Sequence, residues 1–151
     1  MKIIAHRGLL SGPDILLENS PTQINNALSN GFDVEIDVWL INDELFLGHL
    51  TPTYPITATF LKQTGIWAHA KNLEAFEFLL DNNVNCFWHQ TDDFTCTSEG
   101  YIWTYVGKTQ MTSRSIFVQN ENYNFDDIRK IMPHGVCTDY PVQLVIDLGR
   151  I

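Results

Sequence analysis

The sequence predicts an α/β fold, namely a small or incomplete (β/α)8 TIM-type barrel with several outer helices shortened or missing. Short apolar runs alternate with helical segments along the chain, which is typical of parallel βαβ units. We count eight strand-like runs, which is the strand number of such a barrel. The 151 residues fall short of the ~250 that a complete barrel typically needs, so several crossovers must be loops of about ten residues. An open or incomplete barrel is therefore the alternative to a closed one.

Each strand is predicted from an apolar run that ends at a turn signal. The clearest run is Phe32–Val38, in which three acidic residues alternate with apolar residues at the two-residue period of a strand. An Asn42-Asp43 turn separates this run from the next one. The predicted strands are Lys2–Ala5, Phe32–Val38, Leu45–Gly48, Ile66–Ala70, Asn85–His89, Tyr101–Tyr105, Ser115–Gln119 and Gly135–Thr138.

Capping signals predict about four helices. Ser20 is a suitable N-cap, Pro21 fits the first helical position, and Gly31 follows the predicted end of the same helix. Pro133 terminates the last helix of the four. The predicted helices are Pro21–Asn30, Thr57–Gln63, Asn72–Asp81 and Phe125–Met132.

The composition indicates one folded domain spanning residues 1–151. Hydrophobic residues make up 44% and charged residues 18% of the chain, which excludes the disordered, fibrous and disulfide-stapled classes. The three cysteines, Cys86, Cys96 and Cys137, match no zinc or disulfide spacing. Because a sparse, odd number of cysteines suits a reducing compartment, we expect a cytoplasmic protein.

The charge balance excludes some partners. The formal net charge of −9 would repel a nucleic acid, since such binding relies on clustered Lys and Arg. No run approaches the ~18 apolar residues of a membrane span, and no basic and apolar leader precedes Lys2. The excess of acids either serves solubility or includes carboxylates that converge on a cation.

Two carboxylates share one face of the second predicted strand. Glu35 and Asp37 are two residues apart, so their side chains point the same way. Like charges at this spacing repel unless a cation lies between them. The pair is therefore either the polar face of a half-exposed strand or a pair of oxygen ligands for Mg²⁺ or Ca²⁺.

Three histidines stand at the ends of predicted strands. The carboxyl ends of barrel strands form one rim, where active sites lie, so His6, His49 and His69 are candidates for proton transfer or metal binding. Arg7 follows His6, and Lys71 comes two residues after His69, so both could offer positive charge to a phosphate. For any single histidine taken alone, an ordinary position at a strand end or in a loop is the favoured interpretation.

Several of these residues belong to segments in a recognisable order. The segments are Ile3-Ile4-Ala5-His6-Arg7-Gly8, Leu17-Glu18-Asn19-Ser20, Gly31-Phe32-Asp33-Val34-Glu35-Ile36-Asp37-Val38, His49, Trp103-Thr104 and Gly135-Val136-Cys137-Thr138-Asp139-Tyr140-Pro141. This order resembles the glycerophosphodiester phosphodiesterase family, within the superfamily of PLC-like phosphodiesterases. The matches span nearly the whole chain, so it resembles a shortened and divergent member.

The resemblance implies metal-dependent hydrolysis of a glycerophosphodiester-like substrate, a small or lipid-derived phosphodiester. It also implies a role for each matching residue, although which histidine is the acid and which is the base stays open. The implied roles are acid and base for His6 and His49, metal ligation for Glu35 and Asp37, phosphate contact for Arg7 and Lys71, and orientation of the site for Glu18.

Two departures from the family pattern bear on the metal and the substrate. The family's third carboxylate ligand falls at His69, whose imidazole is softer than a carboxylate. Mg²⁺ and Ca²⁺ stay the expected ions, with Mn²⁺ and Zn²⁺ as alternatives. Leu50 stands where the family has an aspartate, so His49 must be oriented by another group. Trp103 either lines the pocket or packs in the core, and core packing is favoured for a tryptophan.

Two other functions fit the same residues. One is a lyase-type phosphodiesterase that stops at a cyclic phosphate, and the other is a non-catalytic module that retains only phosphate binding. The missing helices would also leave apolar barrel wall exposed. We therefore expect a homodimer.

Overall fold

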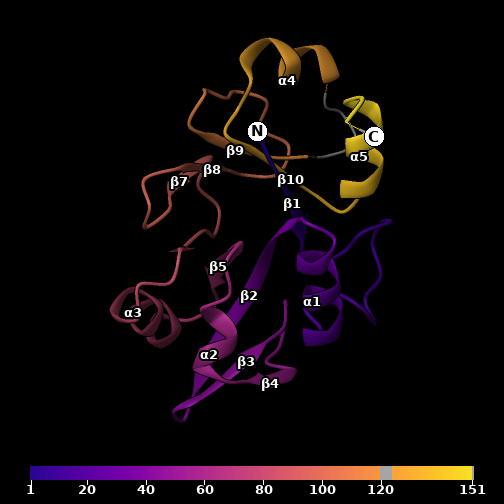
Figure 1. The fold of residues 1–151 in the computed structure, drawn as a ribbon. Helices are drawn as coiled ribbons and strands as arrows, with labels where there is room; N and C mark the ends of the chain where they lie inside the picture. The colour runs from indigo at the N-terminus through magenta and orange to yellow at the C-terminus, as the bar shows by residue number, and fades with distance from the viewer. Residues whose placement is uncertain (120–123, 151) are drawn as a thin grey trace.

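The computed structural model describes residues 1–119 and 124–150, and its elements form a mixed α/β fold around one curled sheet (Figure 1). Within these residues the strands are β1 (Lys2–His6), β2 (Asp33–Ile41), β3 (Glu44–Leu47), β4 (Tyr54–Ile56), β5 (Ile66–Ala70), β6 (Cys86–Phe87), β7 (Phe94–Cys96), β8 (Ile102–Thr104), β9 (Ser115–Val118) and β10 (Gly135–Thr138). The helices are α1 (Pro21–Ser29), α2 (Ala58–Leu61), α3 (Leu73–Asp81), α4 (Phe125–Ile131) and α5 (Pro141–Asp147).

Parallel pairing organises most of the sheet. Among the described residues, seven strands run parallel in the order β6-β5-β2-β1-β10-β9-β8. No ladder joins β6 to β8 in this part of the chain, so the curled sheet is an incomplete barrel, in agreement with the predicted alternative. The opening is partly bridged, because β7 pairs antiparallel with β8 and the following Ser98 donates its backbone N–H to Cys86 O at 2.8 Å.

The prediction of eight successive barrel strands is wrong for the third strand. The predicted strand Leu45–Gly48 forms β3, but β3 pairs antiparallel with the far end of β2, and β4 then pairs antiparallel with β3. Asn42 and Asp43 join β2 to β3 with φ angles of 49° and 64°. A two-residue turn of this kind can only connect antiparallel strands. β3 and β4 therefore join the sheet as an antiparallel hairpin at the far end of β2 and add no strand to the parallel barrel order.

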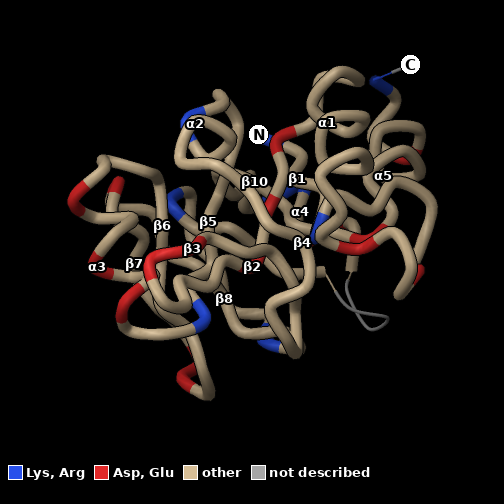
Figure 2. The backbone as a smooth tube through the Cα atoms, turned by 90° about the horizontal axis from the view of Figure 1, so that it is seen from below, with Lys and Arg blue, Asp and Glu red and all other residues tan. Residues whose placement is uncertain are grey.

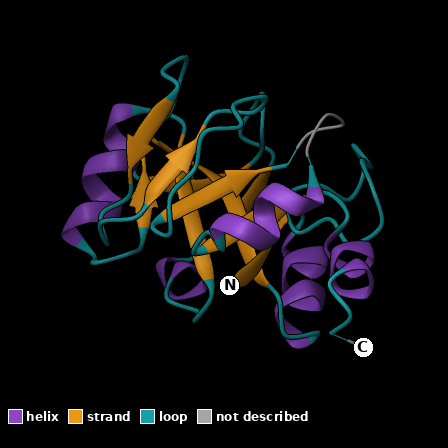
Figure 3. Ribbon diagram, turned by 90° about the horizontal axis from the view of Figure 1, so that it is seen from above, coloured by secondary structure: helices purple, strands orange, loops and turns teal. Residues whose placement is uncertain are grey.

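The helices lie around the strands (Figure 3). The four predicted helices are confirmed in place, and Ser20 caps α1 by accepting the Gln23 N–H at 3.3 Å. In the described residues the crossovers from β6 to β8 and from β8 to β9 contain no helix, as the short chain predicts. The helix α5 was not predicted, and Pro141 occupies its first turn.

Alternation along the strands separates an inner apolar layer from an outer one. The outer layer lies between the strands and the helices, and Ile24 of α1 and Leu79 of α3 are fully buried in it. The inner layer fills the curl of the sheet with Ile4, Trp67, Phe87, Trp103, Ile116 and Cys137. Polar side chains replace this inner layer at the carboxyl ends of the strands, which leaves room for a site there.

Two further features concern the surface. In the described part of the chain, no helix has the length and hydropathy needed to cross a membrane. Apart from the adjacent Arg129 and Lys130 of α4, Lys and Arg occur singly along the described backbone (Figure 2).

Candidate active site

One cavity of about 430 Å³ opens at the carboxyl ends of the parallel strands. Nearly all of the candidate residues from the sequence line it, and Glu18 adjoins it through an ion pair with Arg7. Those that line it are His6, Arg7, Glu35, Asp37, His49, His69, Lys71 and Trp103. Trp103 also stacks on Phe87 with ring centroids 4.3 Å apart, so it belongs to both the inner core and the cavity wall.

Strand register brings the polar side chains together. On the β1–β2 ladder His6 lies opposite Glu35, and on the β2–β5 ladder Asp37 lies opposite His69. These neighbours are about thirty residues apart in the sequence, and their contact depends on β2 pairing with both β1 and β5. The histidine of the third predicted strand end, His49, reaches the same cavity from the β3–β4 loop.

Three side chains form a cluster suited to a cation. One ligand atom each from Glu35, Asp37 and His69 lies within 4.8 Å of the others. His69 Nδ1 is 3.1 Å from Asp37 Oδ1 and 3.9 Å from Glu35 Oε1. Its Nε2 donates to the carbonyl oxygen of His89 at 2.8 Å, and because a carbonyl only accepts, Nε2 carries a proton. Nδ1 therefore faces the two carboxylates. This nitrogen carries either a second proton or a lone pair that could bind a metal ion.

The two carboxylates have opposite electrostatic environments. Burial raises the pKa of Glu35, and the negative charge of Asp37 raises it further. Burial also acts to raise the pKa of Asp37, but the hydrogen bonds from His49 and His69 outweigh it and hold that pKa well below its ordinary value. The Asp37 carboxylate is thus already compensated, whereas the charge of Glu35 is the one that a cation would relieve most.

Asn19 holds Asp37 in place, a role that the sequence analysis missed. Asn19 is fully buried; its Nδ2 donates to Asp37 Oδ2 at 2.9 Å, and its Oδ1 accepts the Asp37 backbone N–H at 2.9 Å. Its φ of 59° lies in the left-handed region, which Asn tolerates better than most residues. The feature of the sequence that could have indicated this role is the position of Asn19, directly between Glu18 and Ser20, the N-cap of α1.

Asp139 is the second residue that the sequence analysis left without a role. His6 Nδ1 lies 2.7 Å from Asp139 Oδ1, and His6 Nε2 lies 3.8 Å from Glu35 Oε2. Burial lowers the pKa of His6, but the hydrogen bond with Asp139 and the charge of Glu35 outweigh it, so the pKa is raised. Asp139 follows β10 directly, and the β1–β10 pairing carries it to the end of β1.

Arg7 links His49 to Glu18. One guanidinium nitrogen donates to Glu18 Oε2 at 2.8 Å and the other to His49 Nε2 at 3.1 Å. Since a guanidinium only donates, His49 must accept at Nε2 and donate from Nδ1, which lies 3.1 Å from Asp37 Oδ2. Asp37 is thus the group that orients His49.

The remaining cations are placed around the same carboxylate. Lys71 Nζ lies 3.4 Å from Asp37 Oδ1. Arg7 Nε is buried without a hydrogen-bond partner, 3.5 Å from Asp37 Oδ2. Burial lowers the pKa of Arg7, but Glu35 and Glu18 outweigh it and raise that pKa, so the guanidinium is firmly charged.

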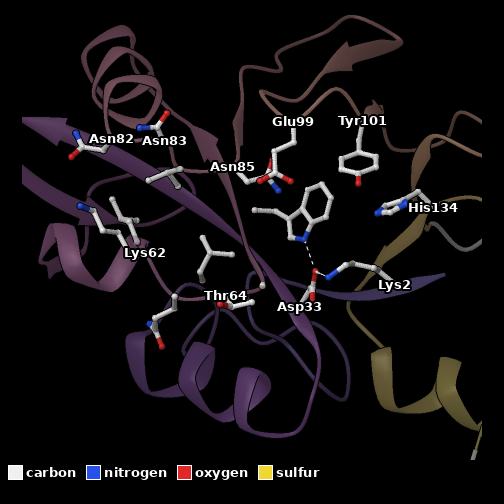
Figure 4. Close-up of a pocket in the computed structure, with 16 residues that line it drawn as sticks. Lys2, Asp33, Lys62, Thr64, Asn82, Asn83, Asn85, Glu99, Tyr101 and His134 are labelled. Carbon is white, nitrogen blue, oxygen red and sulfur yellow. Dashed lines mark hydrogen bonds and ion pairs between the residues drawn. The ribbon is translucent and has the colours of Figure 1, made fainter.

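A second cavity of about 490 Å³ lies at the amino ends of the strands and contains none of the predicted site residues (Figure 4). Trp67 Nε1 and Lys2 Nζ both donate to Asp33 Oδ2, at 2.9 and 2.8 Å. Tyr101 stacks on His134 with centroids 3.9 Å apart. Burial lowers the pKa of His134, and the positive charge of Lys2 lowers it further. These five residues thus contact one another, whereas Asn85 Oδ1, which also lines this cavity, is buried without a hydrogen-bond partner.

The sequence matches no known protein-family model, and no curated protein is similar enough to it to count as a match. The geometry of the first cavity is therefore the main evidence for what the protein does.

Proposed function

We propose that this chain is a metal-dependent phosphodiesterase that works with two histidines, on a TIM-type barrel that has lost part of its outer layer. The observation that carries this proposal is the composition of one cavity. A cluster of Glu35, Asp37 and His69 lies between two histidines that are each held by a carboxylate, with two cationic side chains beside them. The resemblance to glycerophosphodiester phosphodiesterases supports the same reading.

The donor set fits a divalent cation. Its three members are two buried carboxylates and an imidazole whose second nitrogen is fixed by a carbonyl, which is the usual support of a ligating histidine. A bound cation would stabilise negative charge on phosphoryl oxygens. The carboxylates favour Mg²⁺ or Ca²⁺, and the imidazole of His69 extends the range to Mn²⁺ or Zn²⁺.

Arg7 and Lys71 would hold the phosphate. Both side chains stay largely out of solvent and lie beside the carboxylates, so they supply positive charge where a phosphodiester would enter. The contact from Arg7 to His49 would be exchanged for a contact to phosphate. This exchange would free Nε2 of His49 for the substrate.

The two histidines would divide the proton transfers. Nε2 of His49 accepts the hydrogen bond from Arg7, so this nitrogen carries a lone pair and no proton. An unprotonated nitrogen that faces the cavity suits the base. His6 is held at Nδ1 by Asp139 and presents Nε2 to the cavity, which suits the acid that protonates the leaving alkoxide. The base would act either on water or on a hydroxyl of the substrate, and the second choice would give a cyclic phosphate.

A screen of phosphodiesters with several divalent metals tests the proposal, with Glu35→Ala as the blank. We expect His6→Ala and His49→Ala each to lower the rate at least ~100-fold, the usual contribution of one proton transfer. His134→Ala is the matched control, since His134 lies at the other end of the barrel, and it should keep the wild-type rate.

Rates of His6→Ala and His49→Ala within a few-fold of wild type would refute the assignment of the two histidines. Absence of divalent binding at millimolar concentration, measured by calorimetry, would favour the non-catalytic module. Phosphorus NMR of the product separates hydrolysis from a lyase that accumulates cyclic phosphate.

A further inference from the structure

The most exposed large apolar side chains in the described part of the chain lie beside the candidate active site. Ile15 is 79% exposed, Leu16 is 80% exposed and Leu50 is 79% exposed. We call these three residues the aliphatic rim. Leaving so much aliphatic surface in water is unfavourable, and a cluster of such side chains at one place commonly marks an interaction site.

The aliphatic rim is continuous with the cavity. Ile15 and Leu16 belong to the loop from β1 to α1, and Leu50 belongs to the loop from β3 to β4. The first loop is tied to the start of β4, directly after the second loop, where the Tyr54 hydroxyl donates to the Leu16 carbonyl at 3.4 Å. Ile15 and Leu50 line a depression of about 180 Å³ together with His49, and His49 also lines the active-site cavity.

The shape of the aliphatic rim suits a lipid layer better than a folded protein partner. Its side chains project from two loops and form no helix or strand face. A folded protein partner needs an extended complementary surface, whereas a lipid layer accepts separate protruding side chains without shape complementarity. The formal net charge of −9 disfavours an anionic layer. A lipid layer with zwitterionic headgroups requires no shape complementarity and carries no net negative charge.

We infer that the aliphatic rim inserts into an assembled, zwitterionic lipid surface and so presents the cavity to a phosphodiester carried by a lipid. This inference rests on the proposed function for the nature of the substrate. The rim would bind the apolar part of the lipid layer, while Arg7 and Lys71 would meet the phosphate at the level of the headgroups.

Cosedimentation with phosphatidylcholine vesicles tests the inference. Wild-type protein and Glu35→Ala are both expected to bind, since Glu35 belongs to the buried carboxylate cluster and not to the aliphatic rim. The triple variant Ile15→Ser, Leu16→Ser, Leu50→Ser should lose about a thousandfold in partitioning, since each buried aliphatic side chain contributes roughly tenfold. Ile146→Ser is the matched control, because Ile146 is exposed at the far end of α5 and should not affect binding.

Two safeguards keep the test decisive. Circular dichroism establishes that the triple variant is folded, and the single variants Leu16→Ser and Leu50→Ser report the same loss in smaller steps. Phosphatidylglycerol vesicles form the anionic arm. Binding to these and not to phosphatidylcholine would overturn the inference, because the attraction would then be electrostatic.

Binding and hydrolysis are measured separately, so the two proposals fail separately. Hydrolysis of bis(p-nitrophenyl) phosphate without any vesicle binding would overturn the lipid surface and leave the phosphodiesterase standing. Rim-dependent vesicle binding without hydrolysis of any diester would support the lipid surface and count against the phosphodiesterase. A third outcome is that wild-type protein does not bind vesicles, and that light scattering finds wild-type protein as a dimer and the triple variant as a monomer. The aliphatic rim would then be a contact between two copies of the chain, and the inference would be wrong.

Discussion

His6 and Asp139 show how a single contact sets the state of a candidate catalytic group. Their 2.7 Å contact links the ends of β1 and β10 and leaves only Nε2 of His6 for the cavity. Asp37 serves His49 in the same way at 3.1 Å. In each pair the carboxylate orients the ring.

Asp139→Asn should slow the reaction without weakening substrate binding. The amide cannot compensate a positive charge on His6, so we expect kcat to fall roughly 10–100-fold, with KM changing little because Asp139 contacts the ring and not the phosphate. Steady-state kinetics on a good phosphodiester measures both values. Asp147→Asn changes a half-buried carboxylate on α5, far from the candidate site, and is the control.

A fall in kcat no larger than that of Asp147→Asn would show that His6 does not need its partner. A loss of divalent affinity in Asp139→Asn, seen by calorimetry, would mean instead that the change disturbs the carboxylate cluster.

At the scale of elements, the loop after β3 explains how a hairpin outside the barrel order delivers His49. The Gly48 N–H donates to Asp37 O at 3.2 Å, and the Trp39 indole donates to Gly48 O at 2.7 Å. A Cβ on Gly48 would lie 2.0 Å from the Thr51 carbonyl oxygen, and the φ of this glycine is +152°. The turn that aims His49 therefore excludes any side chain at this position.

Gly48→Ala should destabilise the protein far more than Gly31→Ala. Gly31 also has a positive φ, +84°, but nothing lies within 4 Å of its Cβ position. We expect a loss of about 1 kcal/mol in the free energy of unfolding for Gly31→Ala from backbone strain, and ~3 kcal/mol or more for Gly48→Ala from strain and overlap together. Urea unfolding of both variants measures the difference, and equal losses would contradict the close approach at Thr51.

At the scale of the whole molecule, the curled sheet keeps its inner apolar layer buried, although the crossovers from β6 to β8 and from β8 to β9 contain no helix. Cys137 of β10 and Cys86 of β6 are fully buried, whereas Cys96 of β7 is exposed. Burial raises the pKa of Cys86, and burial together with the nearby Glu35 carboxylate raises the pKa of Cys137 well above its ordinary value. The three thiols thus report on different parts of the sheet.

Iodoacetamide should label Cys96 at least ~100-fold faster than Cys137 at pH 8, since alkylation needs an accessible thiolate. Mass spectrometry of the native protein with time measures the rates, and Cys96→Ser confirms the assignment of the fast site. The two buried thiols should become reactive in urea together with global unfolding. Labelling of Cys137 in native protein as fast as Cys96 would mean that the inner layer opens to solvent in the native state.

Local features were predictable because local chemistry sets them. The cap at Ser20, the turn at Asn42-Asp43 and the shared face of Glu35 and Asp37 depend on neighbours within a few residues. Short elements such as β7 and α5 escaped prediction, because pairing with β8 and packing on β1 support them more than their own sequence does.

The sequence by itself determined the α/β alternation, the two carboxylates on one strand face and the candidate histidines at strand ends. Only the tertiary structure decided that β3 leaves the barrel order and that Asn19 and Asp139 hold Asp37 and His6. The physical reason is that hydrophobic periodicity and helix capping depend on neighbouring residues. Strand order depends instead on pairing between segments that are distant in the sequence. Register between β1, β2, β5 and β10 then fixes which side chains meet.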